Sequence, residues 1–444
     1  MENIFKGMSV SQIIVSVYIG LIIIGGLVLS LPMSSASGDW TGYLDALFTA
    51  TSALCVTGQV TLNTTTHWSP FGKMFLLLLI EVGGLGFITL WMLFFMMRGS
   101  KANMRQRIIL LESLNLPADF DLKKIVTYIV QFTLFVQIIG ALLLCFAFIP
   151  EFGWITGISY GFFHSISAFN NAGFDLLGDS LIGYQTNFYV LFIISILIIA
   201  GGLGFLVWRD LLTYRHNRKL LRYTKLTLIG TATILIAGFI LFILSEGTNG
   251  TFNHLSLGDF LMNTFFLSVT PRTAGFANID YSHLSTLGSF ITLILMFIGG
   301  SSGSIAGGVK VSTIMVTSMF LIRYFTGKPF TIYARTVKIA TIRRALFLIL
   351  AALSIITFAS MVLLLTEDIP HGFGIEYILM EVISCLSTVG LTMGLTPNLT
   401  IIGKIILIIL MLMGRVGLIT FLWSIGSHRN NISIKYPEMN IMIG

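Results

Sequence analysis

The chain has 444 residues, of which 55% are hydrophobic and only 10% are charged, and its mean hydropathy is +0.91. Soluble domains carry roughly 25% charged residues, so this composition excludes a soluble globular protein and indicates an integral membrane protein. The formal net charge of +7 does not indicate nucleic acid as a partner, because the basic residues are concentrated in alternate loops between the apolar segments.

Eight apolar segments are candidates for membrane-spanning helices. In chain order they cover about residues 13–33, 71–97, 125–149, 188–208, 226–245, 286–322, 344–366 and 401–424. Most of them reach the ~20 apolar residues that cross a bilayer. The first has a long apolar stretch after a single basic residue, Lys6, which favours a retained helix over a signal peptide. We predict an all-α membrane protein with eight spans.

A short amphipathic segment and a glycine loop precede every second span. The segments lie at about 41–55, 157–170, 257–270 and 373–387, and are too short to cross a bilayer. The loops that follow them are Val56-Thr57-Gly58, Asn171-Ala172-Gly173, Thr273-Ala274-Gly275 and Thr388-Val389-Gly390. Their glycines are 115, 102 and 115 residues apart. One such triplet would be an ordinary turn, but four in register predict four copies of one unit.

The predicted unit consists of a helix, a half-helix, a glycine loop and a second helix. We therefore divide the chain into four repeats, at residues 1–110, 111–220, 221–335 and 336–444. Two spans per repeat return the chain to its starting side, so the four repeats share one orientation and surround one axis. Non-helical backbone at membrane depth is tolerated where it is buried in protein or lines water, which places the loops on that axis.

Two further patterns recur with the loops. Ser52, Ser167 and Ser384 lie six residues before their loop glycine, whereas Ser268 lies seven before, so that one inserted residue would explain the offset. A second glycine motif follows each loop after 24 to 28 residues and begins at Gly83, Gly201, Gly299 and Gly414. Close helix packing is one interpretation of this motif, and helix flexibility near a pore is the other.

The charges predict the orientation in the membrane. Six basic residues lie in each of the segments 98–124, 209–225 and 323–344, whereas the opposite loops carry mainly acids. By the positive-inside rule, both termini are cytoplasmic and all four glycine loops face outside. The basic exceptions on the outer side are Lys73, Arg272 and Lys404.

The four loops fit a filter for a monovalent cation. Backbone carbonyls can replace the hydration shell of a cation without carrying a full charge, and glycine adopts the required dihedral angles at little steric cost. None of the triplets contains an acid, whereas a divalent-selective pore would be expected to carry a ring of carboxylates. We therefore predict potassium as the ion, with sodium as the alternative, and no transition metal.

A glycine- and serine-rich segment interrupts the sixth span. Residues 299–308 contain five glycines and three serines, which predicts an unwound loop over 299–310, below the filter. The residues expected to form a gate there are Gly299, Gly300, Ser301, Ser302, Gly303, Ser304, Gly307 and Gly308. A tight helix-packing strip is the alternative. We interpret Lys310 as a lysine that extends to the membrane surface.

Arg415 lies within the last span, where an ionisable side chain is costly and usually functional. Its guanidinium would repel cations, or donate hydrogen bonds to carbonyls of the 299–308 loop and hold the loop shut. Pairing with an acid such as Glu81 is the alternative. We hypothesise that Arg415 and the loop form the gate. Glu381, in the fourth half-helix, is expected to bond to the protein behind the filter.

The motifs resemble those of the Trk/Ktr/HKT superfamily of cation transporters. The resemblance rests on the loops CVTGQ (55–59), NNAGF (170–174), RTAGF (272–276) and STVGL (387–391), together with MGRVGL (413–418). Eight spans without an additional amino-terminal pair resemble most the KtrB-type membrane subunits of bacterial Ktr potassium uptake. The resemblance covers essentially the whole chain.

The resemblance implies a potassium-translocating subunit of the bacterial cell membrane, with the intramembrane loop as its gate. It also implies a homodimer with one pore per protomer and with residues 437–444 at the interface. A cytosolic octameric ring of KtrA-type subunits would bind the regulatory nucleotide, and uptake would be stimulated by sodium. The HKT branch commonly has serine at the position of Gly58, so the glycine favours the potassium type.

Two other classes of function fit the sequence less well. A coupled Na⁺/K⁺ secondary transporter would usually have inverted or paired repeats, whereas four parallel units are predicted here. An intramembrane enzyme is disfavoured because the chain has no HExxH motif and its seven histidines are scattered. We expect no enzymatic activity and no cofactor in this chain beyond the transported K⁺.

Overall fold

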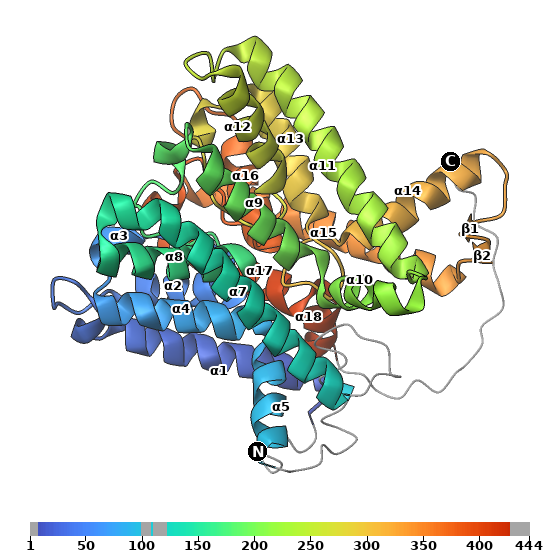
Figure 1. Ribbon diagram of the computed structural model, residues 1–444, viewed down its shortest axis with the longest axis horizontal. Coiled ribbons are helices and arrows are strands. Elements are labelled where there is room, and N and C mark those ends of the chain that lie inside the picture. Colours follow the sequence, from blue (N-terminus) through green and yellow to red (C-terminus); the bar gives the residue numbers. More distant parts are fainter. Residues whose placement is uncertain (1–7, 99–107, 110–121, 427–444) are drawn as a thin grey trace.

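Long apolar helices alternate with short helices and loops in the computed structural model, which describes residues 8–98, 108–109 and 122–426 (Figure 1). Four helices in this part of the chain are long and apolar enough to cross a membrane. They are α1 (Val10–Ser30), α7 (Leu122–Phe152), α11 (Arg222–Asn249) and α15 (Ile339–Thr366). These helices lie where the first, third, fifth and seventh spans are predicted.

The other predicted spans are broken. The breaks separate α4 (Pro70–Leu85) from α5 (Phe87–Met97), α9 (Phe188–Leu203) from α10 (Phe205–Asn217), and α17 (Ile401–Val416) from α18 (Leu418–Ile425). The bends measure 88°, 97° and 110°. The candidate spans 71–97, 188–208 and 401–424 therefore each consist of two helices with a sharp bend between them. The glycines between the helices, Gly86, Gly204 and Gly417, have φ of 78°, 92° and 95°, which right-handed helices exclude.

The predicted sixth span consists of two short apolar helices. They are α13 (Thr286–Ile298) and α14 (Val311–Phe325), and the non-helical residues 299–310 separate them. Within the described residues, four helices are long enough to cross a membrane, or up to seven spans if each bent pair is counted as one. The number eight stays a prediction.

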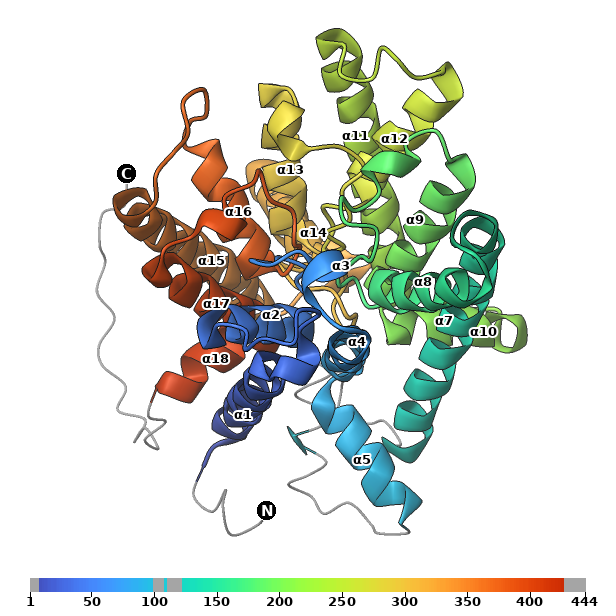
Figure 2. The same cartoon turned by 90° about the vertical axis from the view of Figure 1, so that its left-hand side faces the viewer.

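Four short helices precede the glycine loops. They are α2 (Tyr43–Cys55), α8 (Trp154–Phe169), α12 (Leu257–Val269) and α16 (Glu376–Ser387), and their bounds lie within three residues of the predicted half-helices. Figure 2 shows these helices on different sides of the middle of the molecule. Asp45, Asp259 and Glu376 lie in the first turns of α2, α12 and α16, where a negative charge complements the helix dipole.

The remaining elements are small. They are the turns η1 (Pro32–Ser34), η2 (Ile182–Tyr184), η3 (Tyr281–His283) and η4 (Thr396–Asn398), the short helix α3 (Thr64–His67), and the antiparallel strands β1 (Thr331–Ile332) and β2 (Arg335–Thr336). The two strands follow α14, and Figure 1 shows α14 and the strands standing out from one side of the molecule.

Burial places the core around the glycine loops and leaves apolar side chains on the outside. Phe48, Phe169 and Phe266 of the half-helices are fully buried, whereas Phe146 of α7 and Phe358 of α15 are 74% and 72% exposed. Large exposed aromatic side chains on long helices are unfavourable in water and favourable in a lipid bilayer. The outer faces of these helices therefore suit contact with lipid.

Candidate functional site

The four glycine loops share one backbone conformation. In each loop the first residue of the triplet and the glycine have positive φ, whereas the residue between them does not. The angles are 58° and 98° at Val56 and Gly58, 57° and 68° at Asn171 and Gly173, 77° and 77° at Thr273 and Gly275, and 51° and 96° at Thr388 and Gly390. This conformation ends each half-helix and turns the chain back, and glycine adopts it most readily.

The four loops meet in a closed ring. The carbonyl oxygen that precedes each glycine lies beside the glycine of a neighbouring loop. The pairs are Thr57 O with Gly390, Ala172 O with Gly58, Ala274 O with Gly173, and Val389 O with Gly275. A Cβ added to any of these glycines would lie within 3 Å of that oxygen. The structure thus brings residues 58, 173, 275 and 390 to a common centre, with four backbone oxygens around it.

A hydroxyl group at the end of each half-helix holds its loop. Ser52 Oγ and Ser384 Oγ accept hydrogen bonds from the amides of Gly58 (3.0 Å) and Gly390 (2.9 Å). In the second loop the direction is reversed, since Ser167 Oγ donates to the Phe174 carbonyl at 2.7 Å. These contacts fix the chain on both sides of the glycines.

The third half-helix uses a different residue from the one expected. Ser268 Oγ donates to the Leu235 carbonyl on α11 at 2.8 Å and does not reach the loop. Thr270 Oγ1 instead donates to the Phe276 carbonyl at 2.6 Å, as Ser167 does in the second loop. An inserted residue is therefore the wrong explanation of why Ser268 lies seven residues before Gly275. The hydroxyl group that bonds to the third loop belongs to Thr270, two residues after Ser268.

Glu381 lies behind the first and fourth loops. Its side chain is fully buried and accepts hydrogen bonds from Gln59 Nε2 at 2.6 Å and from Thr396 Oγ1 at 2.9 Å, and also from Thr392 Oγ1. Gln59 directly follows Gly58, so one carboxylate joins two loops of the ring. A buried carboxylate is tolerated where donors satisfy it. The structure therefore confirms the expected position of Glu381 behind the loops.

Glu81 supports the second loop. Its Oε2 accepts from Gln137 Nε2 at 2.8 Å and from Asn170 Nδ2 at 2.7 Å, and Asn170 directly precedes Asn171. The alternative pairing of Arg415 with Glu81 is therefore absent from the described structure, whose ion pairs within 4.0 Å include none between these residues. Glu81 and Glu381 thus both hold residues that directly precede or follow the loop triplets.

The three basic residues that depart from the predicted charge pattern make separate contacts. Lys404 Nζ lies 2.7 Å from Asp45 Oδ1 and joins α17 to α2, and Lys73 Nζ donates to the Thr65 carbonyl at 2.7 Å. Arg272 is buried directly before Thr273 of the third loop. The exceptions to the charge pattern are thus tied to the fold near the loops.

The loop 299–310 lies directly under the ring. A Cβ on Gly307 would come within 3 Å of the Ser387 carbonyl and of Thr388, at the end of the fourth half-helix. The loop is anchored to the α9–α10 bend, because Ser301 N donates to the Gly202 carbonyl at 3.1 Å and Phe205 N donates to the Gly303 carbonyl at 3.2 Å. The segment is non-helical and packs against the end of the fourth half-helix.

Arg415 ties this loop to another part of the chain. Its Nη1 donates to the Ile305 carbonyl at 2.5 Å, and its Nη2 donates to the carbonyls of Gly83 and of Gly84, the latter at 3.1 Å. Lys310 Nζ donates to the carbonyls of Ala306 and of Gly307, the latter at 3.2 Å. The expectation that Lys310 extends to the membrane surface is therefore wrong, because its ammonium group is used within the loop.

The second glycine motif serves both packing and bending, at different glycines. A Cβ on Gly83, Gly201 or Gly414 would come within 3 Å of the carbonyl oxygen of Leu54, Phe169 or Leu386, near the end of a half-helix. The last glycines of three motifs, Gly86, Gly204 and Gly417, make the bends described above, whereas the third motif leads into the non-helical residues 299–310. In the first, second and fourth repeats the second helix therefore touches its half-helix and then bends away.

A set of caps at the starts of the second helices was not foreseen. Ser69, Asn187, Ser285 and Thr400 accept hydrogen bonds from the amides of Gly72, Val190, Gly288 and Gly403. Glu246, near the end of α11, accepts from Ser285 Oγ at 2.7 Å, and Glu367, directly after α15, accepts from Thr400 Oγ1 at 2.5 Å. The recurring pattern of Ser or Thr, two residues and glycine before three of the spans could have revealed them.

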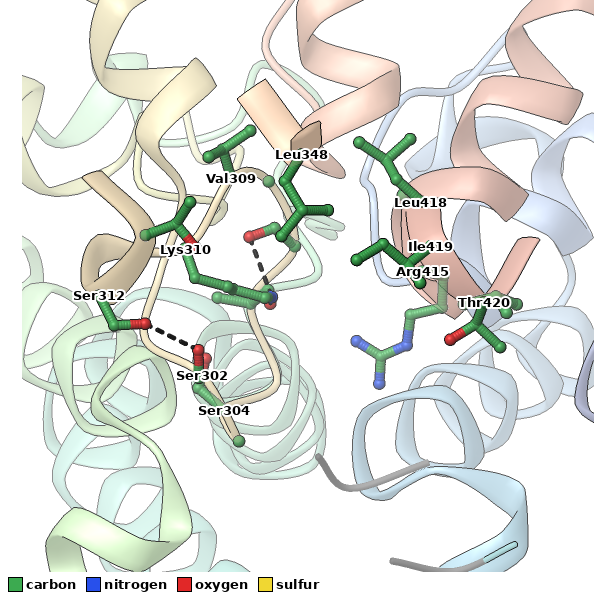
Figure 3. Close-up of a pocket in the computed structure, with 18 of the residues that line it drawn as sticks. Ser302, Ser304, Val309, Lys310, Ser312, Leu348, Arg415, Leu418, Ile419 and Thr420 are labelled. Carbon is green, nitrogen blue, oxygen red and sulfur yellow. Dashed lines mark hydrogen bonds between the residues drawn. The ribbon is translucent and has the colours of Figure 1, made fainter. Parts of the chain in front are cut away.

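A cavity of about 520 Å³ lies beside the loop 299–310 (Figure 3). Lys310 lies on one side of the cavity, on the loop, and Arg415 lies on the opposite side, at the end of α17. The walls also include the α4–α5 and α17–α18 bends and the start of α15. Residues 437–444, predicted at a dimer interface, lie outside the described part of the chain.

Comparison with known proteins gives concordant results. The family model of TrkH, described as a cation transport protein, matches residues 7–427. The potassium/sodium uptake protein NtpJ of Enterococcus hirae is 48% identical over all of this chain and 99% of its own length. The Ktr system potassium uptake protein B of Bacillus subtilis is 39% identical over 95% of this chain and 94% of its own.

A solved structure also matches. It is the crystal structure of the potassium transporter TrkH from Vibrio parahaemolyticus, with a TM-score of 0.74 and 18% sequence identity. The match covers 95% of this chain and 86% of that one. At this identity the likeness concerns the fold, which extends over almost the whole described chain.

Proposed function

The chain belongs to the TrkH family of cation transport proteins and is of the KtrB type, and on this premise we propose that it is the potassium-translocating pore subunit of a bacterial potassium uptake system. The protein would cross the cell membrane several times, with both termini in the cytoplasm. The names of the two relatives, a potassium/sodium uptake protein and a Ktr potassium uptake protein, support potassium as the cargo.

One observation carries the proposal. The oxygens of Thr57, Ala172, Ala274 and Val389 lie beside the glycines of neighbouring loops and close a ring. In the proposed mechanism a potassium ion sheds water at this ring, and backbone oxygens take the place of its hydration shell. Because the oxygens belong to the backbone, side chains act by bracing the loops, as Ser52, Ser384 and Glu381 do.

The loop 299–310 and Arg415 are proposed as the gate beneath this filter. The hydrogen bond from Arg415 to the Ile305 carbonyl would hold the loop in place, and the positive charge would oppose a cation below the ring. At about 6 Å and an effective dielectric constant of about 20, two unit charges repel by roughly 3 kcal/mol. Moving the loop and the guanidinium together would therefore open the path.

We further propose a homodimer with one pore per protomer and a cytosolic ring of nucleotide-binding KtrA-type subunits that acts on this gate. The printed name of the Ktr relatives, a Ktr system protein, supports a system with several components. The chain itself would then translocate K⁺ without enzymatic chemistry, and the regulatory nucleotide would bind to the partner.

The ring can be tested by Gly58→Ser in a potassium-auxotrophic host. The substitution places a Cβ within 3 Å of the Ala172 oxygen, at φ of 98°, a conformation that costs a non-glycine residue about 1–2 kcal/mol. We expect growth at low potassium to be lost or to become sensitive to sodium. Gly38→Ser, at a positive φ with open space around it, is the matched control. Wild-type growth with Gly58→Ser would contradict the assignment of the filter.

A coupled Na⁺/K⁺ transporter is the second candidate, because the relative with 48% identity is named a potassium/sodium uptake protein. The two functions differ in what drives the flux. Measured in liposomes, potassium flux through a channel follows the potassium gradient and the membrane potential alone. Flux that requires a sodium gradient would favour coupling.

A further inference from the structure

The inner cavity is positively charged. Three of the side chains that line it are cationic, namely Lys310, Arg344 and Arg415, and no described lining residue is acidic. Lys310 and Arg415 each donate hydrogen bonds to backbone carbonyls. Carbonyl groups carry no net charge, so these bonds do not neutralise the positive charge of either side chain. An excess of three like charges around one cavity is unfavourable unless an anion or water balances it.

Donor groups remain available in the cavity. Arg344 is exposed and has no ion pair or hydrogen bond among the described residues, so all five of its N–H donors are free. Thr89 also lines the cavity; it is only 1% exposed, and its hydroxyl has no partner in the described structure. A buried hydroxyl without a partner is costly, and a ligand oxygen would satisfy it.

The chemistry and the size favour a phosphate group. Guanidinium groups bind phosphate through pairs of parallel hydrogen bonds, and lysine adds a point charge. At about 520 Å³ the cavity holds more than an ion and its water, and part of its wall is apolar, including Leu226, Val316 and Leu348. A charged head with an apolar neighbour would fill such a space.

We propose that this cavity binds a phosphate group through Arg344, Arg415 and Lys310, with Thr89 as an additional donor. The group belongs either to the headgroup of an anionic phospholipid or to a free phosphate ion. Bound there, it neutralises the positive charge beneath the loop 299–310 and competes for donors of Arg415. If the chain conducts potassium as proposed above, occupancy of the cavity raises the flux.

Binding is measured on the full-length protein, purified in a neutral detergent, by the shift of its melting temperature. The probes are inorganic phosphate, a short-chain phosphatidylglycerol and, as the net-neutral control, a short-chain phosphatidylcholine. We expect Arg344→Gln to weaken binding at least tenfold. Arg343→Gln is the matched control, because Arg343 is adjacent and exposed and does not line the cavity, and it should bind as wild type does.

The outcomes separate the two sources and decide the proposal. Saturable binding of phosphatidylglycerol alone identifies a lipid headgroup, and equal binding of inorganic phosphate identifies the free ion. No saturable binding of either probe overturns the proposal, as does an equal loss in Arg344→Gln and Arg343→Gln. If Arg344→Gln fails to fold, judged by gel filtration, Thr89→Val provides the same test, with an expected loss of about threefold.

Potassium transport is measured in a separate experiment, so that the proposed pore and the proposed phosphate site can be refuted independently. Gly58→Ser should keep the binding of the probe, because residue 58 lies in the ring and not in the cavity lining. Potassium flux in liposomes should rise severalfold with the bound probe in wild type and should not rise in Arg344→Gln. Binding without any flux in wild type would contradict the pore and leave the anion site standing.

Discussion

At the scale of single residues, glycine is required where backbone oxygens crowd together. Gly58, Gly173, Gly275 and Gly390 combine a positive φ with a neighbouring carbonyl oxygen, so two independent constraints exclude a side chain. Gly299 also combines both, beside the Gly307 carbonyl in the loop 299–310, whereas Gly38 has a positive φ in open space and satisfies only one of them. This difference explains why only some of the 44 glycines are predicted to affect transport.

Glu381 offers a sharp test of how the loops are braced. In Glu381→Gln the new amide group would face Gln59 Nε2, Thr392 or Thr396, all of which donate to the carboxylate. A buried donor without an acceptor costs about 1–3 kcal/mol. We expect a lower melting temperature and a lower ratio of potassium to sodium uptake.

The control for this change is Glu376→Gln. Glu376 starts the same half-helix but is only half-buried, and its hydrogen bond among the described residues comes from the nearby Gly374 amide. Its substitution should leave the uptake ratio unchanged. A ratio that is also unchanged in Glu381→Gln would show that the carboxylate does not shape the loops.

At the scale of elements, three of the second helices, α4, α9 and α17, are positioned by a glycine that touches a half-helix. Gly414 on α17 lies against the Leu386 carbonyl of α16, and Gly83 and Gly201 make the same contact on α4 and α9. The contact places the helix directly behind the loop that it follows. The capping residues Ser285 and Thr400, held by Glu246 and Glu367, fix the other end of two such helices.

Gly414→Ala should separate α17 from α16. The added methyl group would lie within 3 Å of the Leu386 oxygen, and overpacking of this kind costs about 1–3 kcal/mol. We expect a fall in melting temperature and in the rate of potassium uptake. Gly20→Ala, in α1 with nothing within 4 Å, should be neutral or slightly stabilising. Equal effects of the two changes would refute the packing argument.

At the scale of the whole molecule, Arg415 connects three distant parts of the sequence. It lies on α17, and it donates to Ile305 in the loop between α13 and α14 and to Gly83 and Gly84 on α4. Gly83 in turn touches the end of the first half-helix at the Leu54 carbonyl. A movement of the loop 299–310 can therefore be transmitted to the ring through the Arg415 side chain.

Arg415→Ala removes this connection and a positive charge from the inner path. We expect a faster potassium leak in liposomes without any regulatory partner, by tenfold or more if the barrier falls by about 1.4 kcal/mol. Arg415→Lys keeps the charge but offers a single ammonium group, and should give an intermediate leak. If Arg415→Ala leaves the flux and its regulation unchanged, the gate does not include this residue.

The membrane class, the half-helices, the four loops with their glycines and the unwound segment at 299–310 can all be predicted from the amino-acid sequence. These features depend on local rules: the length of an apolar run, the end of a short helix, and the backbone freedom of glycine. They can be read from neighbouring residues, without knowledge of what lies across the molecule.

The contacts between these parts become visible in the folded chain. The bends at Gly86, Gly204 and Gly417, the use of Thr270 in place of Ser268, the acceptors of Arg415 and the place of Lys310 inside the loop all depend on contacts between distant residues. Every residue carries a carbonyl oxygen, so the sequence does not identify which oxygen meets a given donor. The ring closes because four such oxygens are brought beside four glycines, and packing alone determines that arrangement.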